Sequence, residues 1–290
     1  MNMDATLGPA SAPRPLRVLT MNIWNFAEPY AARMQQLRSG IERLAPDLMT
    51  FQEAGFAAGR HQVAEVLDGL GYHVAHQFEL APWPGADNGC CLATRWPLSE
   101  LEVVPLAVTP RAAGYPYALL LARVAVPAPV GSLLLVCAKP SWELHREHER
   151  ELQALRLAQV VAERSRPDDF PVVIGGDFDA TPVSGSIRFL RGQQSLAGES
   201  VHFRDAWSEA GDHTPGYTWE AANGYAGAII DAAFHEHRHA RRIDYIFMGS
   251  PHEYRPWAAF RTCRVELTVP EGQVWASDHY AVYAEIDVQR

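Results

Sequence analysis

The sequence has few cysteines and almost no lysine, and each scarcity narrows the classes of protein to consider. Its 290 residues contain four cysteines, Cys90, Cys91, Cys137 and Cys263. Two are adjacent and all four lie in apolar, strand-like segments, so neither a disulfide framework nor the spacing of a metal knuckle is present. We therefore expect reduced core thiols in a cytoplasmic protein. Lys139 is the only lysine, and arginine supplies the other strongly basic positions.

Long apolar runs and a basic charge balance are also missing. No segment approaches the roughly 20 apolar residues that a transmembrane helix needs. Residues 1–15 contain Pro, Ala and Gly but no basic start followed by an apolar stretch, so we expect a flexible lead-in and not a secretion signal. The formal net charge of −9 disfavours avid, non-specific binding of long nucleic acid, because that binding needs cations along the phosphates.

The apolar pattern that is present predicts an α/β fold. Hydrophobic residues make up 48% of the chain, enough for a sizeable core. Neither an internal repeat nor a linker is found, so we expect a lead-in over 1–15 and one domain over 16–290, with two packed β-sheets flanked by helices. The predicted strands are 16–21, 48–51, 72–76, 90–94, 102–108, 119–126, 132–138, 172–175, 243–248, 260–267 and 281–286. The predicted helices are 31–44, 62–70 and 145–164.

Acidic and amide residues stand next to these strands, where enzymes commonly build their sites. Hydrolysis of a phosphoester needs a hard cation, an oriented water and stabilisation of the leaving oxygen. Mg²⁺ prefers a few carboxylates, with water and substrate oxygens as its other ligands. The chain offers a suitable set, although spacing alone does not prove it. The strand-end residues are Asn22, Glu53, Asp177, Asp179, Asp278 and His279.

Five segments carry a resemblance to a known family. They are LTMNIWN (19–25), DLMTFQEAG (47–55), VVIGGDFDATP (172–182), RRIDYIFMG (241–249) and WASDHYAVYAEI (275–286). In this order they resemble the motifs of the endonuclease/exonuclease/phosphatase superfamily, which has a deoxyribonuclease I-like fold. The resemblance implies a four-layer α/β sandwich of two mixed sheets flanked by helices. It also implies a phosphoester hydrolase that depends on Mg²⁺ or Mn²⁺.

The resemblance also implies roles for individual residues. Glu53 resembles the metal-binding glutamate, and Asn22 resembles its neighbour in the metal and phosphate pocket. Asp278 resembles a second acidic contributor near the metal. Asp177 resembles the aspartate that orients or deprotonates the attacking water. Taken singly, each of these residues also fits a strand-end cap, a surface carboxylate or a turn residue; the five motifs together favour the catalytic interpretation.

Asp244 and His279 resemble the carboxylate–histidine pair that contacts the phosphate. A carboxylate on one imidazole nitrogen fixes the tautomer and favours the imidazolium, which can stabilise developing negative charge.

Two positions depart from the family pattern. Asp179 stands where relatives commonly have asparagine, and a carboxylate cannot donate a hydrogen bond to phosphate unless it is protonated. Three interpretations of Asp179 stay open: a metal ligand, a partner of a nearby arginine, or a carboxyl whose pKa is raised beside Asp177. Lys139 stands at the usual histidine position, because the chain reads VCAKPSW (136–142) where relatives often read VNTHLSW. It is either a point charge for a phosphate oxygen or a solvated strand end.

Other polar residues favour structural roles. Arg150 and Gln153 match a family Arg-x-x-Gln pair that braces the sandwich. His145 and His148 have helical spacing that suits a metal, but their charged neighbours favour a solvated surface. Trp219 either stacks on a substrate or is buried.

These observations lead to three functional hypotheses. The first is a cytoplasmic phosphodiesterase or phosphatase that uses Mg²⁺ or Mn²⁺ and acts on a small molecule, a lipid head group or a nucleic acid end. The alternative is a DNA endonuclease, exonuclease or abasic-site repair nuclease, which the acidic charge disfavours. The third is a non-catalytic binding module, which is disfavoured because the motif residues are all present. The sequence indicates no protein partner and does not distinguish monoester from diester substrates.

Overall fold

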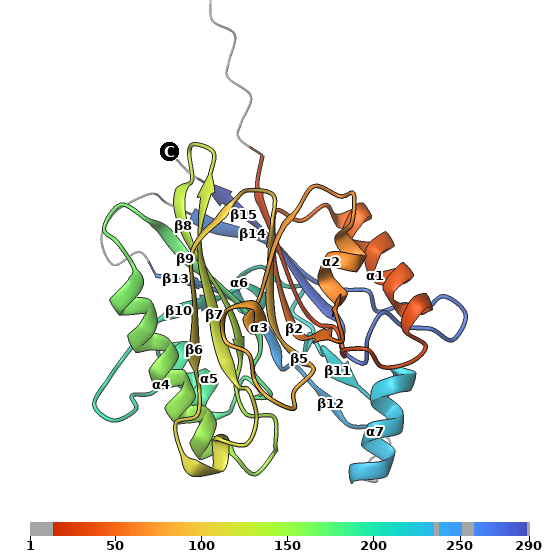
Figure 1. Cartoon of the computed structure of the whole chain (residues 1–290). Coiled ribbons are helices and arrows are strands. Elements are labelled where there is room, and N and C mark those ends of the chain that lie inside the picture. Colours follow the sequence, from red (N-terminus) through yellow and green to blue (C-terminus); the bar gives the residue numbers. More distant parts are fainter. Residues whose placement is uncertain (1–13, 235–237, 251–257, 289–290) are drawn as a thin grey trace, which may run out of the picture.

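The computed structural model describes residues 14–234, 238–250 and 258–288. Most of the predicted lead-in, 1–15, therefore lies outside the described residues. Two β-sheets pack face to face, and helices lie on their outer faces (Figure 1). The predicted four-layer α/β sandwich is confirmed.

The first sheet is mixed and has the strand order β14-β15-β1-β2-β5-β4, with β3 paired to β2. β1 and β2 are parallel, and the other neighbours are antiparallel. The strands are β1 (Leu16–Asn22), β2 (Leu48–Ala57), β3 (Arg60–His61), β4 (His73–His76), β5 (Asn88–Thr94), β14 (Ala258–Glu266) and β15 (Ala281–Val288).

The second sheet has the order β10-β13-β9-β8-β7-β6, and only β8 and β9 are parallel. A small separate sheet joins β11 to β12. The strands are β6 (Leu98–Pro105), β7 (Ala118–Val126), β8 (Gly131–Lys139), β9 (Phe170–Asp177), β10 (Phe203–Asp205), β11 (Trp219–Glu220), β12 (Ala240–Arg241) and β13 (Asp244–Gly249). The strand predicted at 102–108 begins and ends earlier, as β6.

Helices cover both outer faces. α1 (Tyr30–Leu44) and α2 (Gln62–Leu67) pack on the first sheet, whereas α4 (Glu147–Arg164) and α5 (Gly185–Leu190) pack on the second. The predicted helix at 145–164 thus begins two residues later. The remaining helical segments are α3 (Gln77–Leu80), α6 (Ala206–Ala210), α7 (Gly224–Phe234) and a 3₁₀ turn, η1 (Pro110–Ala112). Within the described ranges, no helix has both the length and the apolar character needed to cross a membrane.

The two sheets approach each other closely at the middle of the sandwich. A Cβ atom at Gly175 in β9 would lie 2.2 Å from the Oγ1 atom of Thr50 and 3.1 Å from the Cβ atom of Thr20. Those threonines belong to β2 and β1 and are fully buried. Only glycine fits there, so this residue sets the close contact of the sheets.

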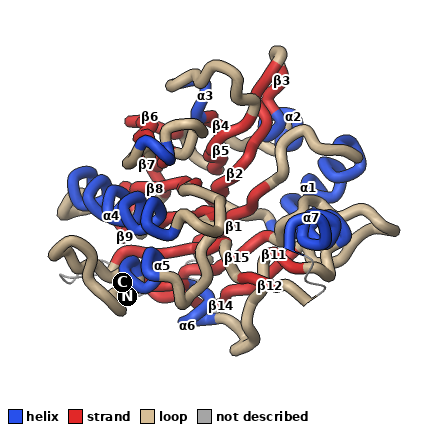
Figure 2. Tube along the Cα trace, turned by 90° about the horizontal axis from the view of Figure 1, so that it is seen from below, coloured by secondary structure: helices blue, strands red, loops and turns tan. Residues whose placement is uncertain are grey.

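Strand direction brings the candidate residues to one end of the sandwich. β1 and β2 run parallel, so Asn22 and Glu53 lie at the same end of the first sheet. β8 and β9 also run parallel, and β13 is antiparallel to β9, with Asp244 opposite Asp177. Figure 2 looks onto the end of the molecule where α7, β11 and β12 lie beside these strand ends.

Candidate active site

Irregular backbone turns two carboxylates toward the gap between the strand ends. The pairing of β2 with β5 shifts register between Phe51 and Ala54, and Glu53 has a φ of 50°. Asp179 follows β9 with a φ of 51°. A positive φ is costly for residues other than glycine and is concentrated at functional sites. The bulge explains why the strand continues beyond the predicted 48–51 and still presents Glu53.

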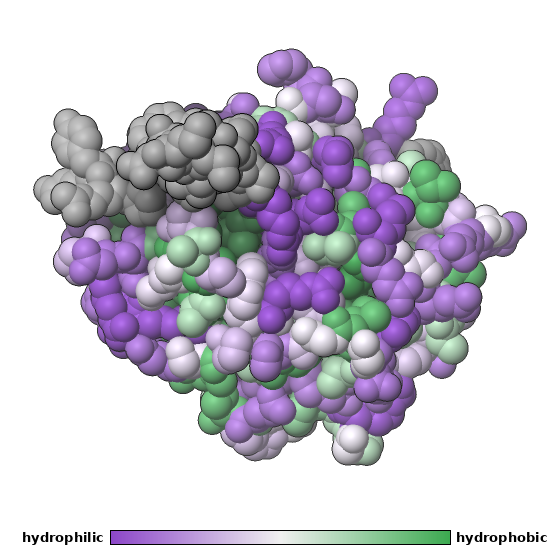
Figure 3. Space-filling view, turned by 90° about the horizontal axis from the view of Figure 1, so that it is seen from above, coloured by the Kyte–Doolittle hydropathy of each residue, from purple (hydrophilic) through white to green (hydrophobic). Residues whose placement is uncertain are grey.

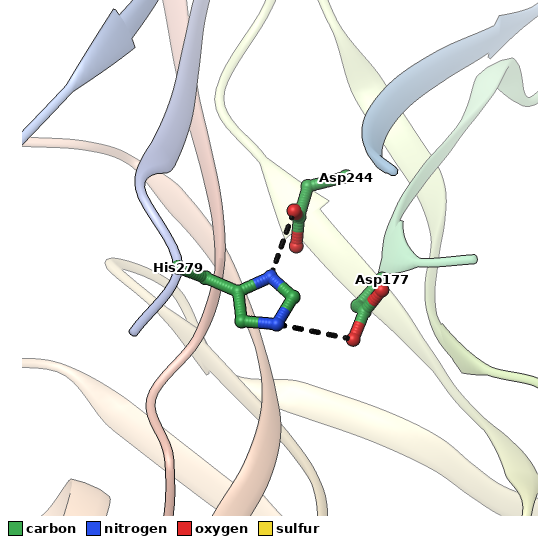
Figure 4. Close-up of side chains that lie close together, drawn as sticks. All are labelled: Asp177, Asp244 and His279. Carbon is green, nitrogen blue, oxygen red and sulfur yellow. Dashed lines mark hydrogen bonds and ion pairs between the residues drawn. The ribbon is translucent and has the colours of Figure 1, made fainter. Parts of the chain in front are cut away.

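Asp244 and His279 form the expected pair (Figure 4). The Nδ1 atom of His279 lies 3.0 Å from the Oδ2 atom of Asp244, and its Nε2 atom lies 3.9 Å from the Oδ2 atom of Asp177. Burial lowers the pKa of His279, but Asp244 and Asp177 outweigh it and raise that pKa well above the usual value. Thr218 holds Asp244 in place, because its Oγ1 atom accepts the backbone N–H of Asp244 at 3.2 Å. The imidazole is therefore oriented and charged.

Lys139 is buried inside the site. Its Nζ atom donates to the Oδ2 atom of Asp177 at 2.6 Å and to that of Asp179 at 2.5 Å. The Oε1 atom of Glu53 lies 3.6 Å away. Burial lowers the pKa of Lys139, but these carboxylates raise it well above its usual value. The side chain is thus an ion-paired ammonium buried in the site and not a solvated strand end.

The carboxylate of Asp179 pairs with Lys139 and not with the side chain of an arginine. Arg241 instead donates to the backbone carbonyl of Asp179 at 2.6 Å. Burial, followed by repulsion from Asp177, raises the pKa of Asp179 to about 6, even though Lys139 opposes the shift. The expected alternative of a raised pKa beside Asp177 agrees with this geometry.

Asn22 links the two sheets at the site. Its Nδ2 atom donates to the Oε1 atom of Glu53 at 2.9 Å and to the Oδ2 atom of Asp177 at 3.0 Å. Its Oδ1 atom accepts the backbone N–H of Trp24 at 3.0 Å. The amide therefore fixes the spacing between a carboxylate of each sheet.

The donor set fits a hard divalent cation. Glu53 and Asp278 line one pocket, where Glu53 is partly exposed and Asp278 is buried. Burial raises the pKa of Asp278; the charge of His279 opposes this shift, and repulsion by Glu53 adds to it. A divalent ion would relieve this repulsion, and carboxylate oxygens are the ligands that Mg²⁺ prefers. Asp177, Asp244 and His279 also offer ligand atoms within 4.8 Å of one another, but a protonated imidazole donates from both nitrogens and has no lone pair for a metal.

The same pocket, with a volume of about 270 Å³, has an apolar wall that was not predicted from the sequence. Trp142 ends the lysine motif, and Trp24 lies within the first motif, so membership of a motif was the available signal for both. Ile229 and Phe234 belong to α7. That helix was missed because its sequence, GYAGAIIDAAF, has two glycines and lacks alternating polar and apolar faces.

The residues for which the sequence favoured a structural role lie outside the group of catalytic side chains. Gln153 in α4 accepts the backbone N–H of Ser141 at 2.9 Å and donates to the carbonyl of Leu106, also at 2.9 Å. His145 and His148 are exposed. Trp219 is buried, with its ring centroid 6.4 Å from that of His279. It therefore forms the inner wall of the pocket.

Comparison with protein families identifies the chain. The model of the Endonuclease/Exonuclease/phosphatase family matches residues 19–279. The chain belongs to this family, whose members are phosphoester hydrolases. The resemblance inferred from the five motifs is therefore confirmed. A search of curated protein sequences found no match.

Solved structures share the fold at low sequence identity. TDP2 from D. rerio, complexed with a single-strand DNA product, is 20% identical with a TM-score of 0.71, covering 93% of this chain and 98% of that one. ANGEL2, a 2',3'-cyclic phosphatase in complex with adenosine-2',3'-vanadate, is 15% identical with a TM-score of 0.71, covering 96% of each chain. The human Nocturnin catalytic domain with a bound sulfate anion is 17% identical with a TM-score of 0.69, covering 95% of each chain.

Proposed function

We propose that this protein is a divalent-metal-dependent phosphoester hydrolase, either a phosphodiesterase or a phosphatase. The observation that carries the proposal is the oriented pair of Asp244 and His279, 3.0 Å apart, in one pocket with Asp177, Glu53 and Asp278. Family membership supports the same class of reaction. We also propose a cytoplasmic location, because the four cysteines are free and buried.

Glu53, Asn22 and Asp278 are the proposed ligands for Mg²⁺ or Mn²⁺. Such an ion, when bound, neutralises phosphate charge and polarises a phosphoryl oxygen. Glu53 is the strongest of the three candidates, because its side chain is partly exposed to the pocket and its charge repels that of Asp278.

His279 stabilises the negative charge that develops on the phosphate. Its raised pKa keeps the imidazole protonated near neutrality, and Asp244 holds Nδ1. The Nε2–H group is then directed toward Asp177 and the pocket, where it can donate to a phosphate oxygen. Oriented donors of this kind contribute more in a buried site than in water.

Asp177 orients the attacking water. Burial raises its pKa, but Lys139 and His279 outweigh burial and lower the pKa below its usual range. An ionised carboxylate accepts hydrogen bonds well, whereas a depressed pKa makes it a weak base. Orientation of the water is therefore its main role, with proton removal dependent on the metal site.

Lys139 and Asp179 act together. The ammonium supplies a fixed positive charge for a non-bridging phosphate oxygen, and Asp179 balances that charge while no substrate is present. The two departures from the family pattern thus balance each other in charge, since a neutral asparagine at position 179 would leave less negative charge beside the Lys139 ammonium.

The alternative, a DNA nuclease, is supported by the TDP2 complex with a single-strand DNA product. Against it, Lys139 and Arg241 are the only lysine and arginine among the described residues that line the pocket. We therefore favour a small or amphiphilic substrate over a long polynucleotide, which needs a track of cations.

The test is a screen of phosphomonoesters, phosphodiesters, nucleic acids and sphingomyelin with Mg²⁺ or Mn²⁺. We expect turnover of at least one class, abolished by EDTA. Asp177→Asn and His279→Ala should each lower kcat by at least about a hundredfold, the scale of general-base and charge-stabilising groups. Circular dichroism checks that each variant is folded. Full activity in either folded variant contradicts its assigned role, and no metal-dependent turnover of any class contradicts the proposal.

A further inference from the structure

Exposed apolar side chains gather at the mouth of the catalytic pocket. Trp142 is 53% exposed, Leu144 is 45% exposed and Ile229 is 38% exposed. All three line the pocket that holds the catalytic residues, together with Ala233 and Phe234. Single exposed apolar residues are ordinary, but a group around a pocket marks a binding surface.

The loop that carries two of these side chains is held firmly by α4. Arg150 donates to the carbonyl of Ser141 at 3.0 Å and to that of Glu143 at 2.7 Å. A third bond joins Arg150 to the carbonyl of Leu144 at 3.2 Å. Trp142 and Leu144 are therefore presented to solvent by a fixed backbone, which keeps an apolar surface ready for a ligand.

The facing wall is α7, an unusually apolar helix. Its one charged residue is Asp231, and its buried residues are Ala226 and Ile230. Ile229 and Ala233 are exposed and line the pocket. A solvated helix normally has a polar outer face. By contrast, the opposite end of the molecule, seen in Figure 3, shows hydrophobic side chains scattered among hydrophilic ones wherever grey atoms do not cover it.

The charges on the pocket floor restrict what the wall can bind. Lys139 and Arg241 both lie on the floor beside Asp179, to whose side chain and backbone they donate, so they can serve one phosphate but do not extend along the wall. Among the described residues that line this pocket, those of the outer wall are apolar, so they offer no charged group to read a nucleobase edge or follow a phosphate chain. An acidic, metal-binding floor joined to an apolar wall matches a ligand with a phosphate at one end and a hydrocarbon chain at the other.

We propose that the wall formed by Trp142, Leu144, Ile229, Ala233 and Phe234 binds the alkyl or acyl chain of an amphiphilic phosphoester. The phosphate of this ligand lies over Glu53 and His279. The inference rests on the proposed function and names its substrate class.

The experiment measures binding without turnover. Methyl-, butyl-, hexyl- and octylphosphonate, which have no ester bond to hydrolyse, are titrated into the whole protein with Mn²⁺ by calorimetry. Burial of each methylene on the wall should tighten binding by about two- to fourfold. Adenosine monophosphate serves as the competing class of ligand and should bind more weakly than octylphosphonate.

Matched variants distinguish a loss of apolar contact at the wall from a non-specific effect of replacing an exposed apolar residue. Leu144→Ser and Ile229→Ser should flatten the dependence on chain length and leave methylphosphonate binding unchanged. Leu101→Ser and Val269→Ser are the controls, because both side chains are exposed and neither lines this pocket. These controls should keep the full dependence on chain length.

Equal affinity for all four phosphonates overturns the inference, as does tighter binding of adenosine monophosphate than of octylphosphonate. Failure of the proposed function is a separate result. In that case the dependence on chain length persists, while the metal-supplemented screen finds no hydrolysis.

Discussion

Lys139 and Asp179 show how two residues far apart in the sequence can depend on each other. Each departs from what relatives commonly have at its position, and considered separately each weakens the expected chemistry. In the folded protein they are 2.5 Å apart and share Asp177 as a neighbour. The ion pair explains why a lysine is stable in a buried position, since an unpaired buried charge is costly.

The pair predicts a non-additive effect of substitution. Lys139→His and Asp179→Asn should each lower kcat/KM by at least about tenfold, because each change removes one member of a buried ion pair and upsets the charge balance beside Asp177. The double variant, which restores the residues common in relatives, should recover part of the loss. A coupling free energy of about 1–3 kcal/mol is expected from a double-mutant cycle.

The matched control for this cycle is the exposed pair of Arg38 and Glu42, 3.1 Å apart. Arg38→His and Glu42→Gln should give a coupling near zero, because exposed pairs contribute little. Strict additivity at Lys139 and Asp179 would show that the two positions act independently.

Much of the site was predictable at the level of residues. Motif order indicated Asn22, Glu53, Asp177 and His279, and the structure places them in contact or in one pocket. The partner of Asp179 was not predictable, because sequence spacing does not report which strand ends meet across two sheets.

At the scale of elements, β4 and α3 depend on a neutral histidine. His76 is fully buried; its Nδ1 atom accepts the N–H of Phe78 at 3.0 Å, and its Nε2 atom lies 2.9 Å from the carbonyl of Ala54. Both contacts are satisfied by one neutral tautomer with its proton on Nε2. Burial accordingly lowers the pKa of His76 to about 4.

Because the pKa of His76 is lowered in the folded protein, we expect the free energy of unfolding to fall in acid. The unfolded chain binds the proton below a pH of about 6.5, whereas the folded protein binds it only near 4. The unfolded state therefore binds more protons in this interval, and stability falls as the pH falls through it, by about 3 kcal/mol in total. Urea unfolding across the interval measures the effect. His76→Asn should lose this part of the pH dependence, while His73→Asn, at an exposed site in the same strand, should retain it.

The close approach of the sheets gives a second prediction for an element. Gly175→Ala would place a methyl group against two buried, stiff threonines, so we expect a loss of about 1–3 kcal/mol in the free energy of unfolding. Gly114→Ala is the control, since a Cβ atom there meets nothing within 4 Å. Equal stability of the two variants would show that the sheets can separate at little cost.

Helices and strands whose apolar residues recur at a regular spacing were predictable from the sequence, and those without such a pattern were not. Most strands of the core were expected close to their observed bounds, because their apolar runs are bordered by polar residues. The bulge in β2 was not predictable, since the partner strand imposes it. Short strands such as β11 and β12 depend on tertiary contacts and carry too few residues for a pattern.

For the whole molecule, the site concentrates negative charge in a chain whose net charge is already −9. Glu53, Asp177, Asp179 and Asp278 lie in one pocket, and Lys139 compensates only part of this charge. The folded state should therefore gain stability from a divalent cation.

We expect the melting temperature to rise on addition of Mg²⁺ or Mn²⁺ and to return with EDTA. At a concentration about a hundredfold above Kd, the gain is about 2.7 kcal/mol, or roughly 5–10 °C for a protein of this size. Glu53→Gln should remove most of the shift, and Glu42→Gln, an exposed change on α1, should not. An undiminished shift in Glu53→Gln would place the ion elsewhere.

The single lysine makes this protein unusually easy to observe by spectroscopy. Isotope labelling of lysine alone would put one side-chain ammonium signal in the spectrum, and it would come from the centre of the site. Because Lys139 is buried and bonded to two carboxylates, its protons should exchange slowly enough with water to be seen. Binding of an ion or a phosphate would change that one signal, so occupancy of the site could be followed without a substrate, a chromophore or an engineered tag.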